Sequence, residues 1–503
     1  MSRPTPRRAR DRRGRSSRLL LALLLTLPML LPLPWRGPAP VAAQTPVAAD
    51  PVLETRLAAL SDEVAAVRDL PPLASRDDRL ISRDALRADL PRQLREENPP
   101  EKIAAITRSS VALGLLPPGE DALADMLAIL GDQIAGYYDP RTKQMFVVAD
   151  GGGLTPSGEF TYVHETVHAL TDAAFTLEQD PGGGANDDAA LAYGALAEGD
   201  ATAASLVFLA DRPDLLAGLA GEGVADSGLV DRMPPALTLP LFFPYVQGTA
   251  FVDALRAEGG WDRVDAAYAD PPASTEQVIH PEKYLAREAP VPLALPDGSA
   301  LGPAWATVDE NTLGELMTAV LLADLRPGQV DAADPDLGLP LPARNAAAGW
   351  GGDRYALWSD GASDVLVWRS AWDSERDAIA FSRALAARES ARWGAAFDAA
   401  APADLTLATA DVAARIVVAG RDVLFVQAPD PALAARALAA AKATPSVPAT
   451  PLAAPLPSAA RAVPRAGIDS GDHRAAAESR RHGGVGEGLA LPRLNLSPSP
   501  SAI

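Results

Sequence analysis

The segment Phe160-Thr-Tyr-Val-His-Glu-Thr-Val-His-Ala-Leu-Thr-Asp172 contains the spacing His164-Glu165-x-x-His168. Residues four apart lie one above the other on the same face of a helix, so both imidazoles can reach one metal ion. Glu165 lies beside them, where its carboxylate can take a proton from a water molecule. With five histidines and 65 acidic residues in 503, a chance match is rare, fewer than about 0.01 per chain. The motif therefore predicts a zinc site.

The residues around the motif predict its structural setting. A helix should run from about Gly158 to Phe175, with Ser157 as its N-cap, and a second from Asp187 to about Ala210, after a loop that contains three consecutive glycines. Upstream, the β-rich stretches 133–138 and 144–149 flank an Asp-Pro turn, which predicts a hairpin.

A catalytic zinc site needs a third protein ligand and an open position. No third histidine follows at short spacing, so we expect an acidic residue from the second helix. The best candidate is Glu198, which lies in an otherwise apolar stretch where a charge needs a partner. Asp200 is an alternative ligand, or an acceptor that orients one imidazole. Asp187 and Asp188 are weaker candidates, because acids at a helix start are explained by the helix dipole.

Two helices, the first carrying HExxH and the second supplying a Glu, resemble those of a gluzincin metallopeptidase. The match His164-Glu165-x-x-His168-Ala169-x-Thr171-Asp172 is similar to the thermolysin group. The resemblance covers roughly residues 130–210 and departs at the third ligand, where Ala-Glu198-Gly-Asp200 replaces Asn-Glu-x-x-x-Asp. It implies a zinc-dependent peptidase whose hairpin edge strand binds the substrate. The whole segment looks like a poorly characterised family of exported bacterial zincin-like proteins.

Gluzincins often place a His or Tyr opposite the zinc, where it stabilises the oxyanion of the tetrahedral intermediate. By this resemblance His280 is a candidate catalytic residue, since it is the remaining histidine between residues 44 and 442. Tyr245 and Tyr284 are alternatives. A loop histidine hydrogen-bonded to the backbone is the competing interpretation of His280.

Composition excludes several classes of protein. The chain has no Cys, which excludes disulfides, Cys-ligated metals and thiol catalysis. Its formal net charge of −20 argues against nucleic-acid binding, which needs a basic face. Any metal site must therefore use His, Asp or Glu, and we expect a peptide or protein as the partner.

The ends of the chain predict export and a disordered tail. Residues 1–43 combine a basic start, a leucine-rich run with two prolines and a Val-Ala-Ala end, as in a secretory signal peptide. An N-terminal membrane anchor is the competing interpretation, but the run is shorter than the ~20 residues that a spanning helix needs. The tail 443–503 is rich in Pro and Ala and lacks aromatic residues, so His473 and His482 should be solvated. We expect a secreted or periplasmic protein without a stable membrane span.

The fold class predicted for the remainder is α+β. A helical lead-in over 44–130 precedes a mainly helical zincin-like catalytic domain with a small β-hairpin, 131–295, and a smaller α+β accessory domain, 296–442. The predicted lead-in helices are 51–69, 84–96 and 119–130; a helix over 237–270 should break at Pro244 and Gly259-Gly260. Predicted accessory elements are helices 312–325, 375–391 and 431–442, strands 354–358, 365–368, 405–408, 415–418 and 423–427, a Gly-rich turn at 349–353, and an aromatic core at Trp350, Trp358, Trp368 and Trp372.

These observations favour an exported zinc metallopeptidase with Glu165 as its general base. The alternative is a catalytically silent zincin-fold module that binds a partner in the cell envelope. Metal-dependent hydrolysis of a non-peptide bond is a third possibility, because HExxH specifies water activation better than it specifies the substrate.

Overall fold

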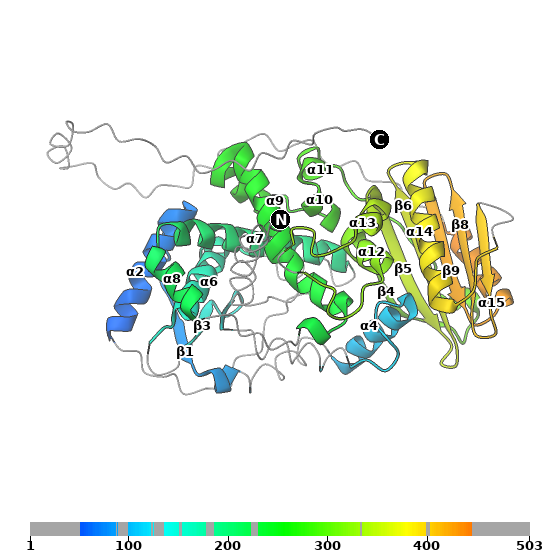
Figure 1. Ribbon diagram of the computed structural model, residues 1–503, viewed down its shortest axis with the longest axis horizontal. Helices are drawn as coiled ribbons and strands as arrows, with labels where there is room; N and C mark the ends of the chain where they lie inside the picture. Colours follow the sequence, from blue (N-terminus) through cyan, green and yellow to red (C-terminus); the bar gives the residue numbers. More distant parts are fainter. Residues whose placement is uncertain are drawn as a thin grey trace, which may run out of the picture. The chain divides into compact units, whose positions relative to one another are not determined.

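The computed structural model describes residues 51–86, 88, 99–121, 124, 135–149, 153–177, 186–222, 230–331, 334–398 and 403–444. They form an α+β fold, mainly helical before residue 300 and built on an antiparallel sheet after it, which confirms the predicted class (Figure 1). The predicted signal segment, most of the helices 84–96 and 119–130, and the tail from residue 445, with His473 and His482, lie outside the described residues.

The helices are α2 (Pro51–Arg68), α4 (Pro100–Leu113), α6 (Pro156–Phe175), α7 (Asp187–Ala210), α8 (Pro213–Glu222), α9 (Pro235–Ala269), α10 (Thr275–Ile279), α11 (Pro281–Leu285), α12 (Gly314–Ala323), α13 (Leu341–Ala347), α14 (Glu375–Trp393) and α15 (Pro431–Ala443), with short 3-10 turns at Val230–Arg232 and Gly298–Leu301. The strands are β1 (Asp78–Ile81), β2 (Gly136–Asp139), β3 (Gln144–Val148), β4 (Ala306–Asn311), β5 (Trp350–Ser359), β6 (Asp364–Trp372), β7 (Asp404–Ala408), β8 (Ala413–Ala419) and β9 (Asp422–Ala428).

The first part of the fold contains a three-stranded sheet in the order β1-β3-β2, which contacts helix α6. The predicted hairpin is present, since β2 pairs antiparallel with β3 and Tyr137 lies opposite Phe146. The prediction of a purely helical lead-in is wrong at β1, a strand that pairs parallel with β3. Four residues are too short to show a period, and the pairing with β3 is what makes them a strand.

Helix α6 begins one residue after Thr155, whose hydroxyl accepts a hydrogen bond from the Gly158 N–H at 3.1 Å. Thr155, not Ser157, is therefore the N-cap, and Pro156 occupies the first helical position, where its missing N–H costs nothing. From Phe160 to Asp172 the helix is buried, so its polar side chains need internal partners.

Helix α9 packs along α7 and continues through Pro240 and Pro244. The predicted break at Pro244 is therefore wrong, while the predicted break at Gly259 and Gly260 is confirmed by their non-helical backbone angles. Gly260 has a φ of +67°, a left-handed conformation that glycine adopts without strain. Packing against α7 outweighs the hydrogen bond that each proline removes.

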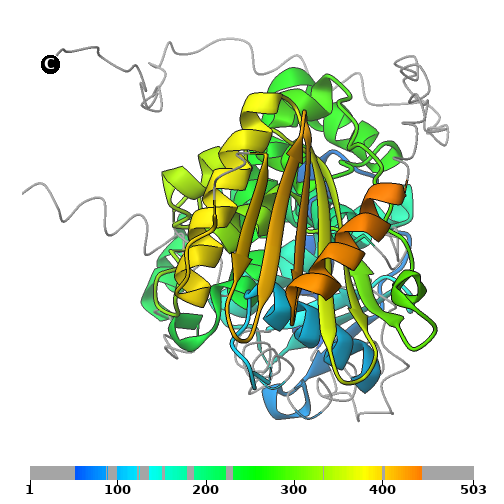
Figure 2. The same cartoon turned by 90° about the vertical axis from the view of Figure 1, so that its right-hand side faces the viewer.

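The second sheet is antiparallel throughout, in the order β4-β5-β6-β9-β8-β7. Figure 2 shows α14 and α15 on opposite sides of it, and their buried side chains belong to two separate core clusters. The predicted turn at 349–353 is instead the start of β5 with a bulge. All four predicted core tryptophans are buried there: Trp350, Trp358, Trp368 and Trp372.

The lead-in helix α2 and strand β1 share a buried core with α6, through Leu60, Leu80 and Val163 among others. Within the described part of the chain, no helix combines the length and apolar character that crossing a membrane requires. The apolar faces of α2 and α6 pack against each other in this core.

Candidate metal centre

Three side chains from two helices converge at one point. Helix α6 presents His164 and His168, and α7 presents Glu198. The Nε2 atom of His164 lies 3.1 Å from Nε2 of His168 and 3.0 Å from Oε2 of Glu198. Nε2 of His168 lies 3.5 Å from the same oxygen. The tertiary structure thus brings together the three predicted ligands.

These spacings suit a tetrahedral zinc ion. Ligands about 2.0–2.1 Å from a metal and separated by tetrahedral angles lie about 3.3 Å from one another, which the observed 3.0–3.5 Å brackets. Two imidazoles and a carboxylate are also a donor set that zinc takes in catalytic sites. The residues present therefore fit the ion that the motif implies.

The two histidines and Glu198 differ in the protonation state that their surroundings favour. Burial lowers the pKa of His164 and keeps its ring neutral, as a metal ligand must be. Burial also disfavours charge on Glu198 and His168, but their mutual attraction lowers the pKa of Glu198 and raises that of His168. The four side chains of the centre, Glu165 included, are between 0 and 2% exposed. A buried carboxylate in such surroundings needs a positive charge beside it, which either a protonated His168 ring or a bound cation supplies.

Glu165 is held with one oxygen bound and the other free. Its Oε2 accepts a hydrogen bond from the backbone N–H of Tyr138 in β2 at 2.7 Å. Its Oε1 is buried and has no hydrogen-bond partner among the described residues. Burial raises the pKa of Glu165 to about 8, and the nearby Glu198 adds to that shift. The raised pKa makes this carboxylate a stronger base than an ordinary glutamate, and Oε1 is the atom available to take up a proton.

Two glycines determine how closely α7 and α9 approach beside the centre. A Cβ on Gly199 would lie 2.2 Å from the carbonyl oxygen of Gly248, and a Cβ on Gly248 would lie 2.2 Å from that of Ala195. Only residues without a side chain permit this crossing. It places Glu198 at the metal centre and Tyr245 of α9 beside it, with ring centroids of Tyr245 and His164 6.2 Å apart.

Asp200 does not join the centre, contrary to both roles considered for it. Its two oxygens accept hydrogen bonds from Arg68, and one also accepts from the Tyr268 hydroxyl at 2.9 Å. Asp188 is also engaged elsewhere, since its carboxylate accepts from the N–H and the hydroxyl of Thr275. Asp187 is half-buried, and its backbone N–H donates a hydrogen bond to the side-chain amide oxygen of Asn311.

His280 lies among other acidic residues. Its Nε2 is 3.0 Å from Oε1 of Glu315, and its Nδ1 is 3.7 Å from Glu282. Tyr284 is also engaged elsewhere, because its hydroxyl donates to the carbonyl of Asp270 at 2.8 Å. Of the three candidates for a residue opposite the zinc, Tyr245 is the one that the structure records in contact with a ligand ring.

A second group of acids, Glu276, Glu288 and Asp373, also has oxygens close enough to hold a metal. The ammonium of Lys283 lies among them, 2.6, 2.9 and 2.5 Å from one oxygen of each. The lysine already supplies the positive charge that these carboxylates need, so the group is an ion-pair cluster.

Sequence reasoning missed two contributors to the centre. The Tyr138 N–H is a backbone donor, and residue type carries no signal for it. Arg68 ends an amphipathic helix, where nothing in the sequence marks it as buried, whereas Asp200 lies in an apolar stretch where a charge needs a partner. Only the fold shows that these two residues pair.

Comparison with known proteins places one part of the chain. Residues 303–438 match the family model of a domain of unknown function, DUF8575. The match covers β4 to α15, apart from the last residues of that helix, and ends well short of the metal centre in sequence. A search of the curated proteins and of the solved structures finds no match to the chain. The matched region nevertheless contacts the ligand-bearing helix α7, because Asn311 accepts a hydrogen bond from the N–H of Asp187, the first residue of α7.

Proposed function

We propose that this protein is an exported zinc-dependent metallopeptidase of the gluzincin type. The observation that carries the proposal is the convergence of His164 Nε2, His168 Nε2 and Glu198 Oε2 within 3.0–3.5 Å of one another. Export rests on the signal-like segment 1–43, with an N-terminal anchor as the alternative. The substrate class, a peptide or protein, rests on the resemblance of the two helices to gluzincins.

His164, His168 and Glu198 would hold the metal. When bound there, zinc would polarise a carbonyl group and lower the pKa of a water ligand. Glu165, oriented by the Tyr138 N–H, would take a proton from the attacking water at its free Oε1 and deliver it to the leaving amine as the peptide C–N bond breaks. Buried surroundings strengthen each of these electrostatic interactions, because little water screens them. Such a mechanism needs no covalent intermediate.

The burial of the centre favours a second candidate function. With all four side chains at most 2% exposed, the centre is also compatible with a closed, structural zinc site in a module that only binds a partner in the cell envelope. A purely structural site does not need Glu165, so substitution of this residue separates the two functions.

The test uses the chain from Gln44 onward and two variants. We expect about one zinc per chain by elemental analysis in the wild type and in Glu165→Gln, and loss of the metal in His168→Ala. Hydrolysis of a mixed peptide library should fall by at least a hundredfold in Glu165→Gln, since general-base catalysis contributes about 10²–10⁴. If the wild type binds zinc but hydrolyses no peptide, the binding module is favoured. If neither the wild type nor Glu165→Gln binds zinc, both proposed functions are contradicted.

A further inference from the structure

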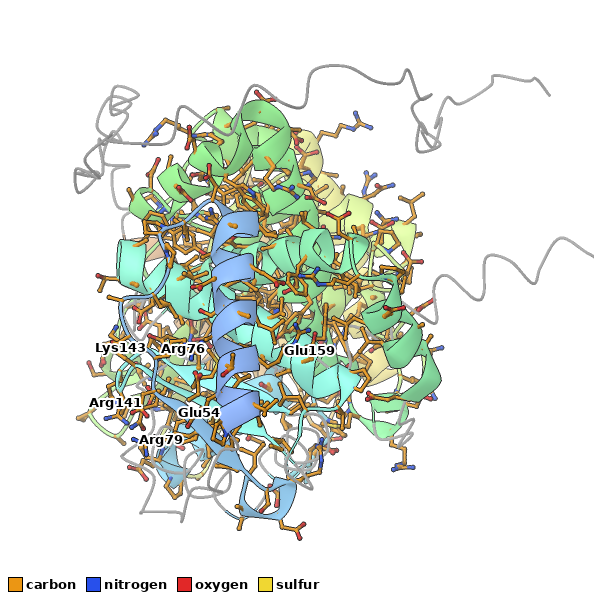
Figure 3. The ribbon with its side chains drawn as sticks, turned by 90° about the vertical axis from the view of Figure 1, so that its left-hand side faces the viewer. Glu54, Arg76, Arg79, Arg141, Lys143 and Glu159 are labelled. Atoms are coloured by element: carbon orange, nitrogen blue, oxygen red, sulfur yellow. The ribbon has the colours of Figure 1, made fainter. Side chains whose placement is uncertain are left out.

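Helix α2 contacts both helices that carry the metal ligands. Against α6, the Tyr162 hydroxyl donates to the carbonyl of Leu57 at 3.2 Å, and Arg56 pairs with Glu159 at 2.7 Å. Figure 3 shows α2 crossing this side of the molecule, with Glu159 beside it. Tyr162 is two residues before His164. The side of α6 away from the ligands is therefore tied to α2.

Against α7, the contact is made by Arg68, the last residue of α2. Its Nε and one terminal nitrogen donate to the two oxygens of Asp200 at 2.6 and 3.1 Å. The same terminal nitrogen donates to Asp265 of α9 at 2.6 Å, and the guanidinium lies 4.5 Å from the ring centroid of Trp261. Arg68 and Asp200 are fully buried. This two-pronged pairing prescribes both distance and angle between α2 and α7.

The position of Asp200 connects this pair to the metal centre. Asp200 follows Glu198 by two residues, and residues two apart point to nearly opposite sides of a helix. Holding Asp200 on one side of α7 therefore sets the rotation at which Glu198 faces α6 on the other. A buried ion pair contributes little net stability compared with apolar packing, but it penalises misaligned arrangements.

We propose that Arg68 is a positioning residue of the metal centre, which acts through Asp200 to aim Glu198 at His164 and His168. Segment 51–68 is then an integral part of the site and cannot be removed as a pro-segment. This inference rests on the proposed function, because it takes these three side chains to be the metal ligands.

The test replaces zinc by Co²⁺, whose visible absorption reports the number and geometry of its ligands. In the chain from Gln44, Arg68→Met should weaken Co²⁺ and Zn²⁺ binding at least tenfold and change the Co²⁺ spectrum, as loss of partners outside the ligand shell does by about 10–100-fold. Asp200→Asn should act in the same direction from the other side of the pair. Arg68→Lys keeps the positive charge but loses the planar guanidinium that donates two hydrogen bonds to Asp200, so its metal affinity should be intermediate.

The matched control is Arg388→Met. Arg388 is also a buried arginine, bound to the carbonyls of Leu113 and Gly114 and to Glu389, but it belongs to the DUF8575 domain. We expect it to lower thermal stability without changing the Co²⁺ spectrum. If Arg68→Met binds Co²⁺ and Zn²⁺ as tightly as the wild type, this proposal is overturned and the proposed function is not. The same holds if Arg388→Met loses as much metal affinity as Arg68→Met. Absence of metal binding by the wild type overturns the proposed function and this inference with it. Circular dichroism of each variant identifies a loss caused by failure to fold, and Arg68→Lys and Asp200→Asn then decide.

Discussion

Substitution of Gly199 by alanine tests the close crossing of α7 and α9 beside Glu198. The new Cβ would lie 2.2 Å from the Gly248 carbonyl oxygen, so the helices must separate by about 1.2 Å to reach an ordinary contact near 3.4 Å. Overpacking of this kind costs about 1–3 kcal/mol. The obstacle is main chain, which no rotamer change relieves, so the upper end applies. Replacing Gly by Ala in a helix returns about 1 kcal/mol.

We therefore expect Gly199→Ala to lower the free energy of unfolding by about 2 kcal/mol, which in a chain of this length corresponds to a fall in Tm of about 2–3 °C. Zinc affinity, measured by competition with a chromophoric chelator, should fall as well, because Glu198 is the adjacent residue. Gly194→Ala is the matched control: it lies on the same helix, its Cβ would meet nothing within 4 Å, and it should raise stability by up to about 1 kcal/mol. Calorimetry of the metal-free chains compares the three. A Gly199→Ala chain as stable as Gly194→Ala would refute the close crossing.

Two further substitutions test the surroundings of the centre. The His280→Ala variant should keep its zinc. In the wild type, the hydrogen bond to Glu315 raises the pKa of His280 above its unfolded value of about 6.5. The stabilisation that this bond gives the folded state is therefore complete below about pH 6.5 and is lost as the pH rises through the higher folded pKa. The difference in unfolding free energy from wild type should shrink between pH 6 and 9, and a difference that grows would contradict the pairing. Gly314→Ala and Gly361→Ala both force a left-handed φ on alanine, costing about 1–2 kcal/mol. Only at Gly314 would the Cβ also meet a carboxylate oxygen of Asp188, at 1.7 Å, so urea unfolding should show an additional loss of about 2 kcal/mol or more there; equal losses would argue against this contact.

Much of the local structure was predictable because its signals are local. The second ligand helix spans Asp187–Ala210 as predicted, and strands β7, β8 and β9 lie within two residues of their predicted bounds. Strands β5 and β6 each extend four residues beyond the predicted bounds at one end. Alternating apolar residues identify such strands without any knowledge of their partners. Strands β1 and β4 were missed. Strand β1 is too short to show alternation, and β4 has only Ala306 and Val308 as apolar residues, followed by Asp309 and Glu310.

Part of the candidate metal centre could be recognised from the sequence without the fold. The spacing of His164, Glu165 and His168 places them on one helix, and the lack of cysteine restricts the remaining ligands to His, Asp and Glu. Local periodicity is enough for the first conclusion, because His164 and His168 lie about one helical turn apart, and composition alone gives the second.

Only the tertiary structure decided the partners of the acidic residues on α7. Glu198 and Asp200 stand two residues apart in the same apolar stretch, and either could have been the third ligand on composition. Beside the close crossing at Gly199, Glu198 faces the histidines. Asp200 instead pairs with Arg68, which lies 132 residues earlier in the chain. Such pairings depend on how helices rotate against one another, and that rotation is set by contacts between segments far apart in the chain.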